Sequence, residues 1–238
     1  MLVVNKMFIN MVKQITREMM MIMLVIAPVL AGTFFRIGIP ILEKYVLSRY
    51  GLESVLVSYY EMFSWLLAML IGMLFAFVGG LVILGEIDDN ITKYIMITPA
   101  GMKGYLWSRI MIPAILSGIA ALVCIPIFSL VSLGFYTLVV MVIATMLNGI
   151  VTALLVVSIS SNKVEGMAIG KISGFFCMAF FIPLLVRGMI KYVFILFPMF
   201  WIGEWNIFGG VEKLIIAIFQ FALWIYFLFV RFRKKMIL

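Results

Sequence analysis

The sequence has no histidine and only two cysteines in 238 residues. The absence of histidine excludes histidine-ligated metal sites, proteases of the HExxH type and acid–base catalysis that relies on an imidazole. Cys124 and Cys177 both lie inside apolar runs, so we expect no structural disulfide. Charge is also scarce, because charged residues make up 12% of the chain and hydrophobic residues 66%. Soluble domains are closer to half apolar, so this composition excludes a soluble globular protein.

Long apolar runs occupy most of the chain, and the mean hydropathy is +1.26. A membrane-crossing helix needs about 20 apolar residues, and these runs lack the alternation of polar and apolar residues found in β-barrel strands. We therefore predict an all-α polytopic membrane protein with a single transmembrane domain over residues 1–238. Arg187 and Lys191 interrupt the fifth apolar run, which predicts a span followed by a re-entrant half-helix. The six predicted spans cover residues 19–35, 62–84, 110–131, 137–159, 172–202 with its re-entrant piece, and 214–230.

Residues 1–18 precede the first span and have an amphipathic pattern. Their polar side chains recur at helical intervals, which predicts an interfacial helix that lies along the membrane surface. No A-x-A cleavage site follows the first apolar run, so we favour a retained span over a cleaved signal peptide. The mixed segments 36–61 and 160–171 are predicted to be loops, with room for a short surface helix in the first. The polar residues of the amphipathic segment are Asn5, Lys6, Asn10, Lys13, Gln14, Arg17 and Glu18.

The basic residues of the chain predict its orientation. The formal net charge of +8 would suggest nucleic-acid binding in a soluble protein. In a membrane protein, Lys and Arg instead mark the cytoplasmic side and contact anionic headgroups, so we expect lipid and no nucleic acid as the partner. With six spans, twelve of the 18 Lys and Arg residues lie on the side of the two termini. We therefore predict a multi-pass protein of the bacterial cell membrane with both termini in the cytoplasm.

Residues 86–104 form a long polar interruption between two apolar runs, on the predicted cytoplasmic side. Three acids come first, and Asp89 or Asn90 can cap a short helix whose apolar face would include Tyr94. The proline after Thr98 disfavours helix there and ends the element. A short rigid helix between two spans can transmit force from a partner protein. The predicted partner-contact residues are Glu86, Asp88, Asp89, Asn90, Ile91, Tyr94, Ile95, Thr98 and Pro99.

This segment resembles that of ABC-2 type permease subunits, which carry a pattern of the form E-x-x-x-G-T…T-P…K between their second and third spans. Glu86 matches the acid, Thr98–Pro99 the Thr-Pro pair and Arg109 the closing basic residue. Asn90 stands where the family usually has glycine, and Ile91 where it usually has threonine. The resemblance implies that residues 86–104 contain the coupling helix, which sits in a groove of the ATPase subunit. It also implies an N-terminal elbow helix, six spans and broken outer helices between the last two.

The same resemblance implies the membrane subunit of an ATP-driven exporter, with two permease copies forming the pathway, and it leaves open whether the second copy is identical. A phosphate-binding loop would need G-x-x-x-x-G-K-[ST], and the nearest sequence, residues 166–172, is one residue short and lacks the hydroxyl. We therefore expect no cofactor, metal or catalytic residue on this chain, with ATP and Mg²⁺ bound by a separate ABC ATPase. The almost wholly apolar spans favour a hydrophobic or amphipathic substrate, with a small peptide or toxin ahead of a drug.

A few polar residues near the spans are candidates for the pathway. Asn148 and Gln220 lie in mid-span, where an interhelical hydrogen bond is favoured over contact with substrate. Arg187 and Lys191 either reach outer headgroups or line an exit for an anionic substrate. All ten acids are predicted in loops or at span ends, which disfavours an ion-coupled carrier. An immunity or sensor subunit that binds a toxic peptide stays open, whereas an integral membrane enzyme is disfavoured because no acid–base pair or nucleophile constellation is visible.

Overall fold

The computed structural model describes residues 2–50, 56–96, 101–186 and 188–237. Helices occupy nearly all of these residues, and the described ranges contain no strand. The predicted all-α class is therefore confirmed. Within the described chain, six helical segments are long and apolar enough to cross a membrane. They are Met19–Arg49, Tyr60–Asp88, Gly101–Phe128, Phe135–Ile159, Lys163–Leu185 and Val211–Met236.

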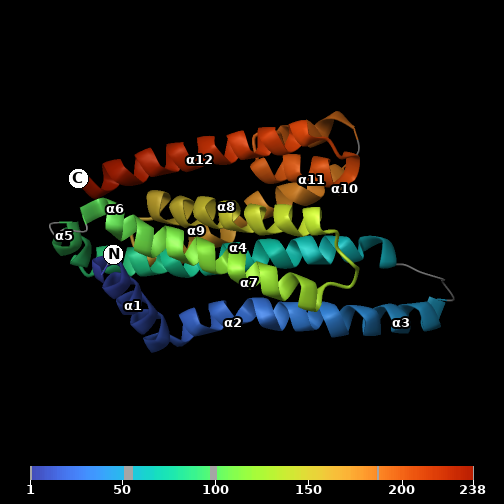
Figure 1. Ribbon diagram of the computed structural model, residues 1–238, viewed down its shortest axis with the longest axis horizontal. Coiled ribbons are helices and arrows are strands. Elements are labelled where there is room, and N and C mark those ends of the chain that lie inside the picture. Colours follow the sequence, from blue (N-terminus) through green and yellow to red (C-terminus); the bar gives the residue numbers. More distant parts are fainter. Residues whose placement is uncertain (1, 51–55, 97–100, 187, 238) are drawn as a thin grey trace.

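The centre of the bundle is formed by α4 (Tyr60–Asp88) and α8 (Phe135–Ile159), which lie side by side (Figure 1). About two-thirds of the apolar part of each helix is buried (67%). Glycines allow the two backbones to approach closely, because a Cβ atom on Gly149 would lie 3.1 Å from the carbonyl oxygen of Gly72. Small residues serve this purpose in membranes, where tight packing rather than hydrophobic burial drives helices together.

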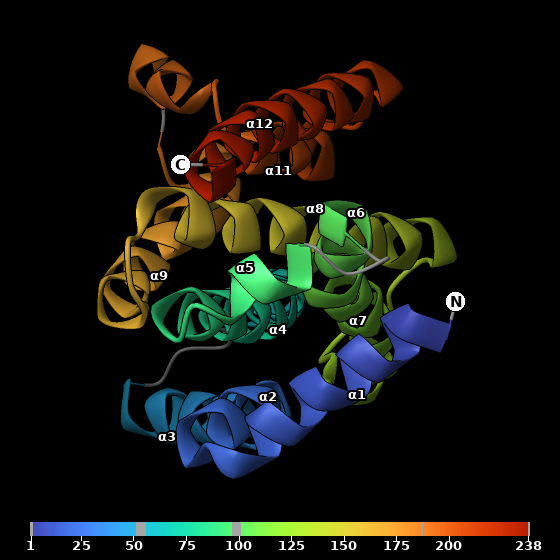
Figure 2. The same cartoon turned by 90° about the vertical axis from the view of Figure 1, so that its left-hand side faces the viewer.

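Two helical segments at opposite edges of the bundle are mostly exposed (Figure 2). One comprises α2 (Met19–Thr33), η1 (Phe34–Gly38) and α3 (Ile39–Tyr50), and the other is α12 (Val211–Ile237). Only 17% of the apolar part of each is buried, as expected for helices that face lipid.

The first span continues as helix through residues predicted to be a loop. The reason is tertiary, because Glu43 of α3 is buried and its carboxylate accepts hydrogen bonds from the Leu56 amide and the Tyr60 hydroxyl. Leu56 lies just before α4, and Tyr60 is its first residue. Their two hydrogen bonds allow Glu43 to be buried, whereas a charged residue at this position of the sequence suggested a solvated loop. Residues 56–59, including the short helix η2 (Val57–Tyr59), lead into α4.

The fifth span also begins earlier than its apolar run suggests. Helix α9 (Lys163–Met178) starts after Asn162, whose Oδ1 accepts a hydrogen bond of 2.9 Å from the Glu165 amide. This N-cap converts most of the predicted loop 160–171 into helix. The chain then breaks as predicted between the last two spans. It passes through η4 (Ala179–Phe181), α10 (Ile182–Leu185), η5 (Met189–Phe194) and α11 (Pro198–Phe208) before α12.

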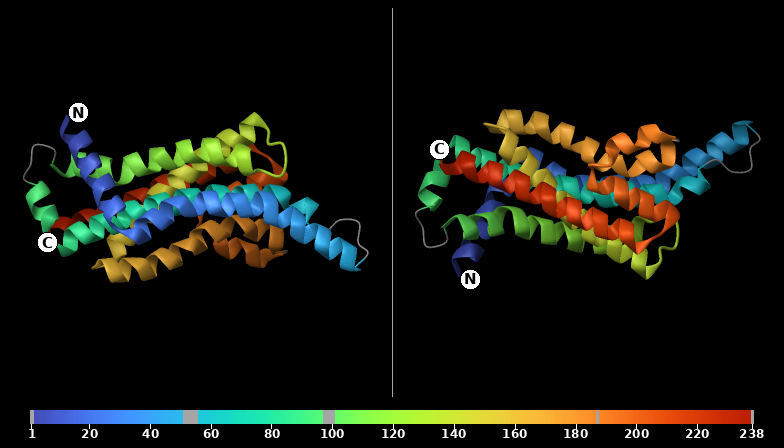
Figure 3. Two further views of the ribbon diagram at one scale, coloured as in Figure 1. Left: turned by 90° about the horizontal axis from the view of Figure 1, so that it is seen from below. Right: turned by 90° about the horizontal axis from the view of Figure 1, so that it is seen from above.

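The remaining elements cluster at the end of the bundle that carries both termini (Figures 1 and 3). The amphipathic α1 (Leu2–Arg17) lies at an angle to α2, with Glu18 in extended conformation between them. The short α5 (Ile91–Met96) lies at the tip, and the third span follows it. That span comprises α6 (Gly101–Leu106), η3 (Trp107–Met111) and α7 (Ile112–Phe128). Helices α3, α10 and α11 lie at the opposite end, so the candidate contact segment is separated from the broken outer elements by the length of the spans.

Candidate functional site

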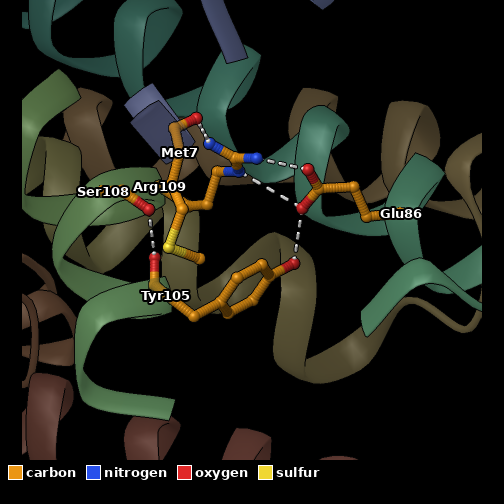
Figure 4. Close-up of polar contacts among 5 residues, drawn as sticks. All are labelled: Met7, Glu86, Tyr105, Ser108 and Arg109. Atoms are coloured by element: carbon orange, nitrogen blue, oxygen red, sulfur yellow. Dashed lines mark hydrogen bonds and ion pairs between the residues drawn. The ribbon is translucent and has the colours of Figure 1, made fainter. Parts of the chain in front are cut away.

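A buried ion pair lies beneath α5, between Glu86 at the end of α4 and Arg109 in η3 (Figure 4). The Glu86 side chain is 2% exposed, and its Oε1 accepts a hydrogen bond of 2.5 Å from Arg109 Nη2. Its Oε2 accepts from Arg109 Nε at 3.2 Å and from the Tyr105 hydroxyl at 2.8 Å. Arg109 Nη1 also donates to the carbonyl of Met7 at 2.5 Å. One carboxylate and one guanidinium therefore join α1, α4 and the start of the third span.

The local backbone helps to aim Arg109 at these partners. It lies in a π-helical turn, Trp107–Met111, which inserts one residue per turn and changes the direction of the side chains that follow. Such a buried pair contributes little net stability when intact, but loss of one partner typically costs about 3–5 kcal/mol. The junction between these elements therefore depends on the presence of both charges.

The acids after Glu86 belong to the end of α4 rather than to the start of α5. The Asp89 amide donates to Gly85 at 3.0 Å and the Asn90 amide to Ile87 at 3.0 Å, which closes the helix. Asn90 has a φ of 58°, so it is in the left-handed conformation, and Asp89 has φ −81° and ψ 1°. Neither residue has the extended backbone of an N-cap residue. The prediction that Asp89 or Asn90 caps α5 is therefore wrong. Asparagine tolerates the left-handed region, which accounts for its presence where glycine is usual.

Asp88 is directed toward the fifth span. Its Oδ2 accepts a hydrogen bond of 3.0 Å from the Lys163 amide in the first turn of α9. The Lys163 ammonium in turn pairs with Glu18, which lies between α1 and α2. These contacts border a polar cavity of about 160 Å³ whose lining includes Gln14, Arg17 and Asp89. The cluster links the first, second and fifth spans at the end that carries α5.

Helix α5 presents a tyrosine outward at the tip of the bundle, where Figure 2 shows α5 in front. Tyr94 is 71% exposed, whereas Thr92 is 6% exposed and faces inward. The side chain of Ile95 and the residues Thr98 and Pro99 lie outside the described part of the structure. Within that part, α5 therefore has one large exposed aromatic side chain on an element that follows directly from the Glu86 junction.

The two mid-span polar residues hold neighbouring elements together. Asn148 is 1% exposed, and its Nδ2 lies 3.1 Å from the Cys177 sulfur, which connects α8 to α9. Gln220 Nε2 donates to the Ile195 carbonyl at 2.7 Å, which connects α12 to the segment between η5 and α11. The Asn148 contact joins two helices, as favoured from the sequence, whereas the acceptor of Gln220 lies in a non-helical segment.

At the opposite end, Lys191 forms an ion pair that the sequence did not suggest. Its ammonium lies 2.5 Å from Glu204 Oε1, so it does not stand free for a headgroup or an anionic substrate. The hydrogen bond to Glu204 raises the pKa of Lys191 above its ordinary value. Arg187 lies outside the described residues. Glu204 is 8% exposed within α11, although all acids were expected in loops or at span ends. In the sequence, the position of Glu204 between Trp201 and Trp205 was the one indication that it could be buried.

Tyr105 is the other site residue that sequence reasoning missed. It lies four residues before Arg109, a spacing that places both on one helical face, and it is completely buried. The signal in the sequence was this four-residue spacing from Arg109, the closing basic residue of the ABC-2-like pattern.

Comparison with known proteins identifies the family. A family model described as "Fluoroquinolones export permease protein Rv2686c-like" matches residues 11–232. The chain belongs to this family. Two curated relatives from Mycobacterium tuberculosis, strains H37Rv and CDC 1551, are both named fluoroquinolones export permease proteins. Each is 26% identical over 243 residues, covering 92% of this chain and 89% of the relative. No solved structure matches the chain.

Membership of the Rv2686c-like family establishes a membrane permease of the exporter type and is consistent with the resemblance to ABC-2 permeases. It also agrees with the six membrane-spanning helical segments of the described chain. The match begins within α1 and ends near the end of α12, so it includes both the Glu86 junction and the Lys191–Glu204 pair.

Proposed function

We propose that this chain is the permease subunit of an ATP-driven exporter and that α5 is the coupling helix that a separate ABC ATPase contacts. The observation that carries the proposal is the position of α5. It presents Tyr94 at the tip of the bundle, and the buried Glu86–Arg109 pair lies just behind it. ATP and Mg²⁺ bind to the partner, whose nucleotide-driven closure displaces α5.

The Glu86 junction is suited to transmit that displacement. Glu86 belongs to α4, Arg109 to the start of the third span, and the carbonyl of Met7 to α1. A push on α5 therefore moves three elements together. Asp88 and Glu18 extend the connection to α9 through Lys163.

The end that carries α5 is the cytoplasmic one in this proposal. Both termini lie there, and the last helix ends in a basic cluster that suits the cytoplasmic membrane surface (Figure 3). The ATPase is then on the side where ATP is available. The cluster consists of Arg231, Arg233, Lys234 and Lys235.

Two copies of the chain form the pathway, and the substrate is hydrophobic or amphipathic. Apolar grooves along the spans support this substrate class, such as the groove of about 190 Å³ between α8 and α12. The names of the mycobacterial relatives favour an amphipathic drug of the fluoroquinolone type over the small peptide or toxin expected from the sequence. An immunity or sensor subunit is the second candidate, and it requires no coupled ATPase.

The test is whether an ATPase co-purifies with the solubilised chain through α5. We expect the wild-type chain to retain its ATPase and to support ATP-dependent export, and the isolated chain to show no ATP hydrolysis. Tyr94→Ala combined with Ile95→Ala should release the ATPase or uncouple it from export, because a buried aromatic anchor commonly contributes about 2 kcal/mol to an interface.

Lys103→Ala is the matched control, because Lys103 is exposed on the neighbouring α6 and should leave both properties unchanged. Retention of the ATPase and of export by the Tyr94/Ile95 variant would remove α5 as the coupling helix. Export without any associated ATPase would remove the ATP-driven assignment.

A further inference from the structure

An ammonium group is held between a carboxylate and two aromatic rings at the end of the bundle opposite α5. Lys191 Nζ lies 2.5 Å from Glu204 Oε1, 5.1 Å from the centroid of the Tyr192 ring and 5.5 Å from that of the Phe208 ring. Two elements supply the groups, because Lys191 and Tyr192 belong to η5, whereas Glu204 and Phe208 belong to α11 and lie one turn apart. Cation–π attraction extends to about 6 Å from a ring centroid.

These surroundings have the chemistry that recognises an organic ammonium. Aromatic faces attract cations through their quadrupole, and they tolerate alkyl groups on the nitrogen. Glu204 supplies the full negative charge, and it is only 8% exposed in α11, one of the short helices between the last two spans of a membrane protein. An ionisable residue in such a position is expensive to bury and commonly marks a substrate pathway.

We propose that Glu204, Tyr192 and Phe208 form a binding site on the exit side for the ammonium group of an amphipathic cargo. In the conformation described, Lys191 occupies this site as a tethered competitor. A cargo ammonium takes its place during export, and Lys191 returns when the cargo leaves. The direction and the role as an exit rest on the proposed exporter function, whereas the binding of an ammonium does not.

The two sides of the ion pair differ in how firmly they are held. Helix α11 is anchored to the central α4, because Trp65 Nε1 donates a hydrogen bond of 3.0 Å to Asn206 Oδ1. Phe200, one turn before Glu204, is completely buried. Lys191 instead belongs to a short 3-10 segment whose Met189 is 87% exposed. The carboxylate is therefore fixed in the fold, and the ammonium is carried by a surface segment.

The preceding backbone favours exchange of this kind. Gly188 has a φ of 89°, a conformation that residues with a side chain rarely adopt, and it is the residue just before η5. Rotation at this glycine can lift Lys191 away while α11 stays in place. The aromatic rings are already accessible, because Tyr192 is 50% exposed and Phe208 is 64% exposed.

A second lysine gives the matched control for the role of Glu204. Lys213 Nζ lies 5.1 Å from the centroid of the Phe208 ring, so it contacts the same aromatic group. The ion pair with Glu204 is formed by Lys191. If the site is defined by the carboxylate, removal of Lys191 must free it, whereas removal of Lys213 must leave it occupied.

The experiment measures choline binding to the full chain in lipid nanodiscs, without an ATPase. Choline is titrated, and the broadening of its trimethylammonium proton signal gives the dissociation constant. The neutral isostere 3,3-dimethylbutan-1-ol and empty nanodiscs serve as controls. Lys191→Met should tighten choline binding roughly tenfold and Glu204→Gln should weaken it roughly tenfold, the size expected for one charged contact near aromatic rings. Lys213→Met should change it by less than about twofold, and the isostere should not respond to any variant.

The opposite signs for the two partners of one ion pair distinguish this site from a structural contact. If Lys191→Met and Glu204→Gln both leave choline affinity unchanged or both lower it, the proposal is wrong. Should Lys191→Met not remain monodisperse, choline must restore its thermal stability, and the isostere must not. Loss of choline binding in Glu204→Gln then supports the site, and unchanged binding overturns it. Because no ATPase is present, failure here leaves the coupling experiment unaffected.

Discussion

Two arginines in this chain lie in π-helical turns, and each donates a hydrogen bond to a backbone carbonyl of another element. Arg36 in η1 reaches the Ser129 carbonyl just after α7, and Arg109 in η3 reaches the Met7 carbonyl of α1. A backbone carbonyl oxygen has two lone pairs, so it can accept a hydrogen bond from a side chain in addition to a bond within its own helix. The π turn changes the direction of the guanidinium enough to donate such a bond, so both irregular turns have the same structural use.

At the same scale, we predict that the two halves of the Glu86 junction depend on each other. Glu86→Met should lower the free energy of unfolding by about 3 kcal/mol or more, because it leaves the buried Arg109 without its carboxylate. The double variant Glu86→Met with Arg109→Met should lose less, because neither charge stays buried alone. The fluorescence of the five tryptophans during thermal unfolding in nanodiscs reports the change.

Lys103→Ala, on the exposed side of α6, serves as the control and should unfold like wild type. A double variant that is as unstable as the single one would show that shape rather than charge holds this junction together. In the sequence, Glu86 was a predicted partner-contact residue, and its burial and its contact with Tyr105 were not visible there.

Among the elements, α4 and α8 depend most on close backbone contact. A Cβ atom on Gly72 would overlap the backbone carbonyl oxygen of Thr145, which cannot move without shifting α8. The single hydroxyl proton of Thr145 is shared between the carbonyls of Ala68, at 3.1 Å, and Met141, at 2.8 Å, so the hydroxyl contacts both helices at the crossing.

We therefore predict that Gly72→Val separates α4 from α8. The expected loss is about 3 kcal/mol or more of stability, in the range of severe overpacking of a core, with reduced yield of monodisperse protein on size-exclusion chromatography. Gly174→Ala in α9 is the matched control, because the nearest atom to its Cβ would be Met73 Cε at 3.9 Å. Equal yield and stability for the two variants would contradict the close crossing.

At the scale of the whole molecule, the C-terminal helix is attached to the end of the bundle that carries α1 and α5. Helix α12 is attached to the end of α8, where the Lys235 ammonium donates to the carbonyls of Val157, at 2.9 Å, and Ser160. Val157 lies in the last turn of α8 and Ser160 directly follows the helix, and carbonyls at a helix end lack partners within their own helix. The C-terminus is therefore held at the same end of the bundle as α1 and α5 (Figure 1).

The orientation can be tested with single cysteines in a background that lacks Cys124 and Cys177. In intact cells, an impermeant thiol reagent should label a cysteine at Arg49 at least about tenfold faster than one at Arg233, because only the first faces outward in the proposed orientation. Both positions are exposed, so burial does not explain a difference. After the cells are permeabilised, both should react. Faster labelling at Arg233 in sealed cells would invert the molecule and place α5 outside.

The fold class of this protein could be derived from sequence because its determinant is local. A run of apolar residues long enough to span a bilayer must form a helix wherever it lies in the chain, since its backbone has no other partners. The same holds for the break before the last span, where Lys191 and the residues around it interrupt an apolar run. The tolerance for Asn90 in the left-handed conformation is likewise a property of one residue and its backbone.

What the sequence could not determine was which charges would meet. Arg109 reaches Glu86 across 23 residues and Met7 across 102, and Lys163 reaches Glu18 across 145. Glu43 looked like a loop residue and Glu204 like one at a span end, until partners from other elements made their burial possible. A charge can enter an apolar interior only with its counter-charge, and that pairing depends on how the helices pack, so it was decided by the tertiary structure alone.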